Sequence, residues 1–248
     1  MCAEEHQIKT ENPRRIFAIS IFCAILGAII RIFYCIYYPV QSRDAYEYGV
    51  IIASWEEMGQ LPAGMKIFPL SLWILKIPNH FFNYEIMKGS ILVNLIVGLL
   101  IIIISIHILG RYFKNDSAVL IAGIVAATHP ELVHYSCSGL RENTYLFFSL
   151  LAIGYLAKYS SGIRICDLLL SAIFASLAFL CRLEGFEFLI IFNMVLFFLF
   201  IFKKIHFSKA VCHSILFWFA FALTVLIICY CFHFSAISSD YILSRFRF

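Results

Sequence analysis

Charged residues are scarce in this chain. Lys, Arg, Asp and Glu make up 14% of the 248 residues, whereas soluble domains carry roughly 25%. Hydrophobic residues make up 62%, and the mean hydropathy is +0.89. This composition excludes an ordinary soluble domain and predicts an integral membrane protein. About seven membrane spans of roughly 20 residues each would occupy most of the length.

Several other patterns are absent as well. The nine cysteines include no CxxC pair and lie mostly in apolar runs, so we expect them to pack as small hydrophobic residues rather than to bind metal. No basic stripe with interleaved aromatic residues occurs, which argues against nucleic acid as a partner. No internal repeat of the kind that builds many transporters is visible.

The apolar runs predict an all-α, polytopic membrane protein with about seven transmembrane helices. The predicted spans are residues 16–38, 90–109, 117–130, 144–157, two spans within 167–202, and 215–234. A single helix over residues 167–202 would be about 54 Å long, well beyond the roughly 30 Å of the hydrocarbon core. Because Arg182 and Glu184 interrupt this run, we expect it to divide there.

Polar segments divide the chain into a membrane domain and two tails. The predicted divisions are a cytoplasmic tail at 1–15, a transmembrane domain at 16–234 with a first external loop at 39–89, and an external tail at 235–248. We expect this loop to contain helices that lie in the membrane interface. Its apolar piece, residues 67–82, is interrupted by Pro69 and Pro78 and is expected to be interfacial or re-entrant.

The distribution of charge predicts which side faces the cytoplasm. With the N-terminus placed inside, the inner segments carry ten of the nineteen Lys and Arg residues, and the outer segments carry ten of the fifteen acidic residues. Cytoplasmic loops are enriched in positive charge, so we expect the N-terminus in the cytoplasm. Arg31 lies inside the first span near its outer end, where we expect it to snorkel to the interface.

Asp44 begins the most polar stretch of the first external loop. Counted from Asp44, the residues Tyr48, Ile51, Ile52 and Trp55 share one face of a predicted helix. A carboxylate at this place would lie at headgroup depth, where a general base for a membrane-bound substrate is needed. The alternative is a helix cap, because Asp followed by Glu three residues later is an acidic form of the capping box.

Three polar clusters are predicted to meet the external face, at residues 43–57, 131–142 and 182–187. Ionisable groups at membrane depth are costly, so a functional role is the first hypothesis for each cluster. The alternative is a set of mutual ion pairs, for example between Arg182 and Glu142, that hold helix ends together.

These clusters carry a family resemblance over about residues 14–235. The segments concerned are Asp44-Ala-Tyr-Glu-Tyr, Phe68-Pro-Leu, His129-Pro-Glu, Arg141-Glu-Asn-Thr-Tyr and Leu180-Cys-Arg-Leu-Glu-Gly. In their order and their placement on one face, the chain resembles the C-type (GT-C) membrane glycosyltransferases of the protein-mannosyltransferase and aminoarabinose-transferase kind, glycosyltransferase family 39.

The resemblance implies transfer of a sugar from a polyprenyl-phosphate donor to a hydroxyl of a lipid, glycan or protein, on the external or lumenal face. Asp44 matches the position of the catalytic base in such enzymes. The residues expected to contact substrate are Arg43, Glu47, Arg141, Glu142, Arg182 and Glu184. The arginines would stabilise the leaving phosphate, and the carboxylates would bind sugar hydroxyls or orient the arginines.

The sequence departs from that family in two respects. Many members follow the first acid directly with a second, whereas here Ala45 follows and the next acid is Glu47. No cofactor is therefore assigned, and a divalent metal stays open. Family members also continue well past this length, so we expect a truncated gene, a fragment or a minimal core. A bacterial inner membrane is favoured over the endoplasmic reticulum.

Two other functions are alternatives to glycosyl transfer. A transporter or non-catalytic membrane partner would suit seven spans, but the charges gather at one face rather than near the midplane. A zinc protease would need an HExxH helix, whereas His129 and His134 are five residues apart with Pro130 between them.

Overall fold

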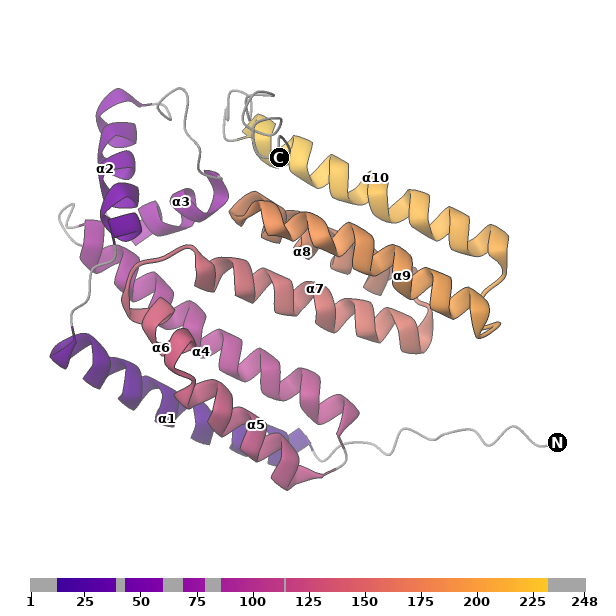
Figure 1. Cartoon of the computed structure of the whole chain (residues 1–248), viewed down its shortest axis with the longest axis horizontal. Helices are drawn as coiled ribbons and strands as arrows, with labels where there is room; N and C mark the ends of the chain where they lie inside the picture. Colours follow the sequence, from indigo (N-terminus) through magenta and orange to yellow (C-terminus); the bar gives the residue numbers. More distant parts are fainter. Residues whose placement is uncertain (1–12, 39–42, 60–68, 79–85, 114, 232–248) are drawn as a thin grey trace.

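The computed structural model describes residues 13–38, 43–59, 69–78, 86–113 and 115–231 (Figure 1). The elements run in the order α1 (Pro13–Tyr37), α2 (Arg43–Met58), α3 (Pro69–Lys76), α4 (Ile86–Tyr112), α5 (Asp116–Thr128), α6 (Pro130–Cys137), α7 (Glu142–Gly162), α8 (Ile165–Cys181), the short 3-10 helix η2 (Leu183–Phe186), α9 (Glu187–Ile201) and α10 (Phe207–Cys231). The described residues contain no strand, and the predicted all-α fold is confirmed. The two tails lie mostly outside the described residues and stay predictions.

The long apolar helices are those of a membrane protein. By length and apolar composition, α1, α4, α10 and the η2–α9 segment could each cross a membrane. The pair α5 and α6, which is bent by 47° at the break between them, could provide a fifth span. Helix α8 is apolar but shorter. The number of seven spans stays a prediction.

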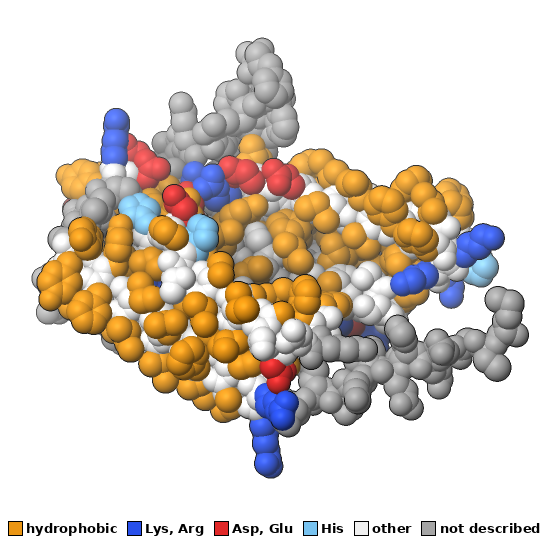
Figure 2. Space-filling view, turned by 60° about the horizontal axis from the view of Figure 1, so that its bottom comes forward, with side chains coloured by type: hydrophobic (Ala, Val, Ile, Leu, Met, Phe, Trp, Pro, Cys, Tyr) orange, Lys and Arg blue, Asp and Glu red, His pale blue; other side chains and the backbone are white. Residues whose placement is uncertain are grey.

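The outer surface of the bundle is apolar, as contact with lipid tails requires. Large hydrophobic side chains such as Phe17, Phe219 and Leu226 are more than 60% exposed along α1 and α10. Figure 2 shows hydrophobic side chains over most of one face, with the charged side chains gathered at its edges. This pattern agrees with the predicted division between lipid-facing and membrane-surface regions.

The long helices form two groups joined by α4. Helices α1 and α5 pack on α4, and α7 packs on it as well, while α8 packs against α7 and α10 (Figure 1). The second group has an aromatic centre, where the rings of Phe192 and Phe217 stack with centroids 3.8 Å apart. Helices α2 and α3 lie across one end of the bundle, next to the start of α4.

The break between α8 and α9 falls where the sequence predicts it. Arg182 has an extended backbone, with φ −151° and ψ 145°, and η2 follows it. Gly185 lies so close to the backbone of Ala178 and Phe179 that no Cβ would fit there. The prediction that residues 167–202 form two helices is confirmed.

The face predicted for α2 is also confirmed. Ala45, Tyr48, Ile52 and Trp55 are buried and pack in one cluster with Leu72 and Leu75 of α3 and with Leu140. The ammonium of Lys76 lies 4.6 Å from the centre of the Trp55 ring and links α2 to α3. Helix α3 is shorter than the apolar piece predicted at 67–82, since it begins at Pro69, a residue favoured in the first helical turn.

One expectation for the first half of the chain is wrong, and another stays a prediction. After the span predicted to end at residue 130, α6 follows a bend of 47°, and the place where the chain leaves the membrane stays a prediction. Arg31 does not snorkel: its side chain is fully buried and hydrogen-bonds to Ala127 and Ser136 on either side of that bend. The part of α1 around Arg31 is apolar on all sides, so the sequence leaves the direction of this side chain undetermined.

Candidate functional site

A turn between α6 and α7 builds one side of the candidate site. Helix α6 ends at Cys137 and α7 begins at Glu142. Between them Gly139 has φ +68°, a conformation that glycine adopts without steric penalty. A Cβ built on Gly139 would lie 3.7 Å from the Cβ of Ala45, so the start of α2 abuts this turn. The turn therefore brings Arg141 and Glu142 next to α2.

Arg182 joins this turn to the end of α8. Its Nη2 lies 2.7 Å from Glu184 Oε1, and its Nε donates to Glu184 Oε2 at 3.2 Å, which makes a two-pronged ion pair. Its Nη1 donates to Glu142 Oε1. The hydrogen bonds to Glu184, together with the charge of Glu142, raise the pKa of Arg182. The alternative of mutual ion pairs is thus present in the structure and ties α7, α8 and η2 together.

Arg141 differs from Arg182 in its partners. Its guanidinium lies 5.8 Å from the centre of the Tyr48 ring, and its Nε is buried without a hydrogen-bond partner. Among the described residues, no carboxylate lies within ion-pair distance of it. Glu142 Oε2 is likewise buried and unpartnered. Buried polar atoms usually have a hydrogen-bond partner. A polar ligand that bound here could form hydrogen bonds with these two atoms.

Tyr48 lies among the charged side chains of the site, whereas its sequence spacing predicts only a place on the apolar face of α2. Burial raises the pKa of Tyr48 to about 12, while the charge of Arg141 opposes that rise. The charges of Glu142, Asp44 and Arg182 also act on it. Its phenol therefore stays protonated near neutral pH. Pattern alone could not separate a site tyrosine from a packing aromatic residue.

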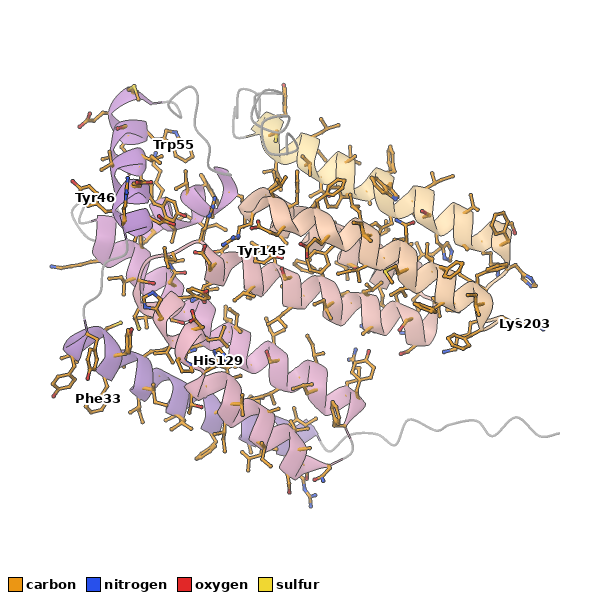
Figure 3. The ribbon with its side chains drawn as sticks, in the orientation of Figure 1. Phe33, Tyr46, Trp55, His129, Tyr145 and Lys203 are labelled. Atoms are coloured by element: carbon orange, nitrogen blue, oxygen red, sulfur yellow. The ribbon has the colours of Figure 1, made fainter. Side chains whose placement is uncertain are left out.

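Tyr145 lies in the first turn of α7, and in the sequence it stands out only as the last residue of the segment Arg141-Glu-Asn-Thr-Tyr. The guanidinium of Arg182 lies 5.9 Å from the centre of its ring. Figure 3 shows Tyr145 at the end of the bundle that carries α2, far from Lys203 at the opposite end. The site thus has aromatic rings beside both Arg141 and Arg182, an arrangement that suits a sugar ring as well as a cation.

Asp44 stands at the edge of this group. Helix α2 begins at Arg43, so Asp44 lies in the first turn of the helix, two residues further in than the N-cap position. Its side chain is exposed, and its charge acts on Tyr48. The residue before the helix lies outside the described residues. The structure therefore places the predicted base, with an exposed side chain, beside the partly buried cluster.

Arg43 and Glu47 are not brought into the cluster. Their side chains are 90% and 50% exposed and form an ion pair of 3.1 Å along the outer side of α2. A pair of this kind stabilises a helix by about 0.3–0.5 kcal/mol. Of the seven predicted site residues, the structure brings together Arg141, Glu142, Arg182 and Glu184, with Asp44 beside them.

The described part of the chain contains no cluster of side chains that could bind a metal ion. No three His, Cys, Asp or Glu side chains there gather closely enough to hold an ion. His134, one half of the rejected zinc motif, shares a hydrogen bond of 3.3 Å with the hydroxyl of Tyr34 instead. The described carboxylates do not by themselves fit a divalent metal.

Comparison with known proteins supports the family. A family model described as dolichyl-phosphate-mannose-protein mannosyltransferase matches residues 66–230, well over half of the chain. No curated protein matches the chain. The matched part includes Arg141, Glu142, Arg182 and Glu184 but begins after α2, so Asp44 lies outside it. The chain belongs to the dolichyl-phosphate-mannose-protein mannosyltransferase family of GT-C membrane glycosyltransferases.

Proposed function

We propose that this membrane glycosyltransferase takes its sugar from a polyprenyl-phosphate donor and passes it to a hydroxyl of a lipid, glycan or protein. The observation that supports this most is the buried pair of unpartnered polar atoms, Arg141 Nε and Glu142 Oε2, beside Tyr48. A cation and a carboxylate next to each other suit a ligand that carries both an anion and hydroxyl groups. A phosphate-linked sugar is such a ligand.

Arg141 is the better placed of the two arginines for the leaving phosphate. As the glycosidic bond breaks, negative charge grows on the lipid phosphate, and a fixed cation stabilises it. Arg182 is already neutralised by Glu142 and Glu184, whereas Arg141 lies over the Tyr48 ring and has a buried Nε without a hydrogen-bond partner. Arg182 would therefore orient the two carboxylates, and Arg141 would contact the phosphate.

The carboxylates would hold the sugar. Glu142 uses Oε1 for Arg182, which leaves Oε2 to accept a sugar hydroxyl. Both oxygens of Glu184 accept hydrogen bonds from Arg182, but its side chain is 48% exposed and each oxygen can accept a second bond, from a sugar hydroxyl. The protonated phenol of Tyr48 can donate a hydrogen bond to a phosphate or sugar oxygen.

Asp44 is our candidate for the general base. The acceptor hydroxyl must lose a proton as it attacks the anomeric carbon, and a positioned carboxylate can accept it. Asp44 is exposed beside the cluster, where an acceptor can reach it. Glu47, one turn further along α2, is the second candidate, and Arg43 beside it would contact substrate from the outer side.

The same proposal sets the orientation in the membrane. The charge distribution favours a cytoplasmic N-terminus, with the cluster on the external or lumenal face. A bacterial inner membrane is favoured over the endoplasmic reticulum. The long apolar helices beside the cluster would accommodate the lipid tail.

Donor turnover by the purified protein tests this proposal. The protein in detergent is supplied with a panel of polyprenyl-phosphate sugars, and release of the lipid phosphate is followed. Asp44→Asn is compared with Glu57→Gln, a change of an exposed acid on the same helix. We expect release by the parent and by Glu57→Gln, and loss with Asp44→Asn.

Each other outcome has its own meaning. Release by Asp44→Asn would keep the enzyme and transfer the role of base to Glu47. Donor binding without release would point to an incomplete catalytic core. Neither binding nor release would contradict the proposal and leave a transporter or a non-catalytic partner as the better account.

A further inference from the structure

Arg31 is a charged residue buried inside the membrane domain. It lies in α1, none of its surface is exposed, and no carboxylate of the described residues pairs with it. A buried charge is costly unless hydrogen bonds or dipoles compensate it. Arginine inside a membrane span is therefore a candidate for a functional role.

Hydrogen bonds from Nε and Nη1 compensate part of the charge of Arg31 at the break between α5 and α6, while Nη2 is buried without a partner. Nη1 donates to the carbonyl oxygen of Ala127 at 3.0 Å and to that of Gly27 at 3.2 Å. Ala127 lies in the last turn of α5, which carries the negative end of the helix dipole. The bend between α5 and α6 interrupts the helical hydrogen bonds and leaves the last carbonyl groups of α5 without a helical donor. Arg31 supplies a donor to one of them, the carbonyl of Ala127.

A chain of polar contacts leads from Arg31 to the candidate site. Its Nε donates to Ser136 Oγ at 3.0 Å, and Asn143 Nδ2 donates to the same oxygen at 3.0 Å. Asn143 Nδ2 also donates to the carbonyl oxygen of Asn94 in α4, at 3.0 Å. Asn143 is the next residue after Glu142 and is fully buried. Ser136 and Asn143 thus hold the two ends of the turn that presents Arg141.

Helix α4 packs against the hydrogen bond between Arg31 and Ser136 through Gly98. A Cβ built on Gly98 would overlap Ser136 Oγ and would lie 3.2 Å from Arg31 Nε. Only glycine at this position leaves room for the hydrogen bond between Arg31 and Ser136. The contact is therefore built from four helices, namely α1, α4, α6 and α7.

We propose that Arg31 is a positioning residue for the candidate site: through Ser136 and Asn143 it fixes the α6–α7 turn and thereby the place of Arg141 and Glu142. The enzymatic consequence rests on the proposed function, whereas the structural consequence does not. Loss of the guanidinium frees the end of α6 and lets the turn shift. Arg141 and Glu142 then no longer hold the geometry that a donor requires.

Native cysteines report the structural consequence without any substrate. Cys23, Cys137 and Cys181 are buried in α1, at the end of α6 and at the end of α8. The Cys137 thiol donates to the carbonyl oxygen of Arg31 at 3.4 Å, so it lies beside the proposed contact. Thiol labelling of each cysteine is followed by peptide mass spectrometry in the parent and in Arg31→Met.

We expect Arg31→Met to accelerate labelling of Cys137 about tenfold while Cys23 and Cys181 stay as protected as in the parent. Gly98→Ala is expected to give the same pattern, because it displaces Ser136 while it leaves the charge of Arg31 in place. If Arg31→Met exposes all three cysteines, the milder Ser136→Ala decides by the same criterion. Unchanged protection of Cys137 in the variants that keep the fold would overturn the proposal.

Kinetics with a polyprenyl-phosphate sugar report the enzymatic consequence. We expect the donor KM to rise about tenfold in Arg31→Met and to recover partly in Arg31→Lys, since an ammonium can replace one hydrogen bond but not the planar fork. Ser20→Ala, a buried change in the same helix whose hydroxyl has no partner, is the matched control and should keep the parent KM. An unchanged donor KM in Arg31→Met would overturn the positioning role.

The two proposals fail in different ways. If the parent itself turns over no donor, the proposed function fails, and the cysteine pattern still decides whether Arg31 fixes the turn. If the parent is active and Cys137 remains protected in the variants, only the role of Arg31 fails.

Discussion

At the scale of single residues, the two arginines of the site illustrate how similar sequence features acquire different roles. Arg141 and Arg182 each stand next to a helix end and an acidic residue. Arg182 forms ion pairs with Glu142 and Glu184, whereas Arg141 stacks near Tyr48 with a buried, unpartnered Nε. We therefore expect Arg182 to matter for stability and Arg141 for ligand binding.

Arg182→Gln should lower the thermal stability of the purified protein. The change leaves the carboxylate of Glu142, whose side chain is 18% exposed, without its partner. Because the pair is only partly buried, we expect a loss of about 1–3 kcal/mol, below the 3–5 kcal/mol typical of fully buried pairs. Thermal denaturation in detergent measures it.

The double variant Arg182→Gln, Glu142→Gln is the control for that prediction. It removes the unpaired charge and should recover part of the lost stability. An Arg182→Gln protein as stable as the parent would show that the ion pairs contribute little, and no recovery in the double variant would show that the loss has another origin.

At the scale of elements, the break between α8 and α9 determines where Arg182 and Glu184 lie. Gly185→Ala should destabilise this break, because the added Cβ would meet the backbone of Ala178 and Phe179. Overpacking of this kind costs about 1–3 kcal/mol. The midpoint temperature of thermal denaturation and the rate of donor turnover should both decline.

Gly162→Ala is the matched control at another helix end. A Cβ at Gly162 would meet only the flexible side chain of Arg164, at 3.7 Å or more. We expect it to keep parental stability and turnover. Equal effects of the two changes would contradict the importance of the close contact at Gly185.

Much of the element layout could be predicted from sequence. The apolar runs and the polar interruption at Arg182 gave the helices and the break between α8 and α9, because burial in lipid demands long apolar helices. The bend at Pro130 could be placed, but not the helix that continues after it. The inward direction of Arg31 and the role of Tyr48 depend on which faces of different helices meet, and uniformly apolar helices carry little information on that.

At the scale of the whole molecule, the two ends of the bundle differ in charge. The candidate site, with its mixed acids and arginines, lies at the end that carries α2. Lys203 lies at the opposite end (Figure 3). If the positive-inside rule applies, that opposite end faces the cytoplasm.

Cys166 provides a direct test of this orientation. It is exposed and is the second residue of α8, next to the turn that follows α7. We expect a membrane-impermeant thiol reagent to label Cys166 in inside-out vesicles but not in intact cells. A Cys166→Ser protein gives the background from other cysteines. Labelling in intact cells would reverse the proposed topology.

The central claim is that the partly buried cluster around Arg141 binds a lipid-linked phosphate. Its most direct test is the affinity of the purified protein for a polyprenyl phosphate compared with the uncharged polyprenol of the same length. A charge-assisted contact of about 1.5–3 kcal/mol predicts a preference for the phosphate of roughly 10- to 100-fold. That preference should disappear in Arg141→Gln and persist in Glu57→Gln. Equal affinity of the parent for the two lipids, or a preference that survives in Arg141→Gln, would contradict the account.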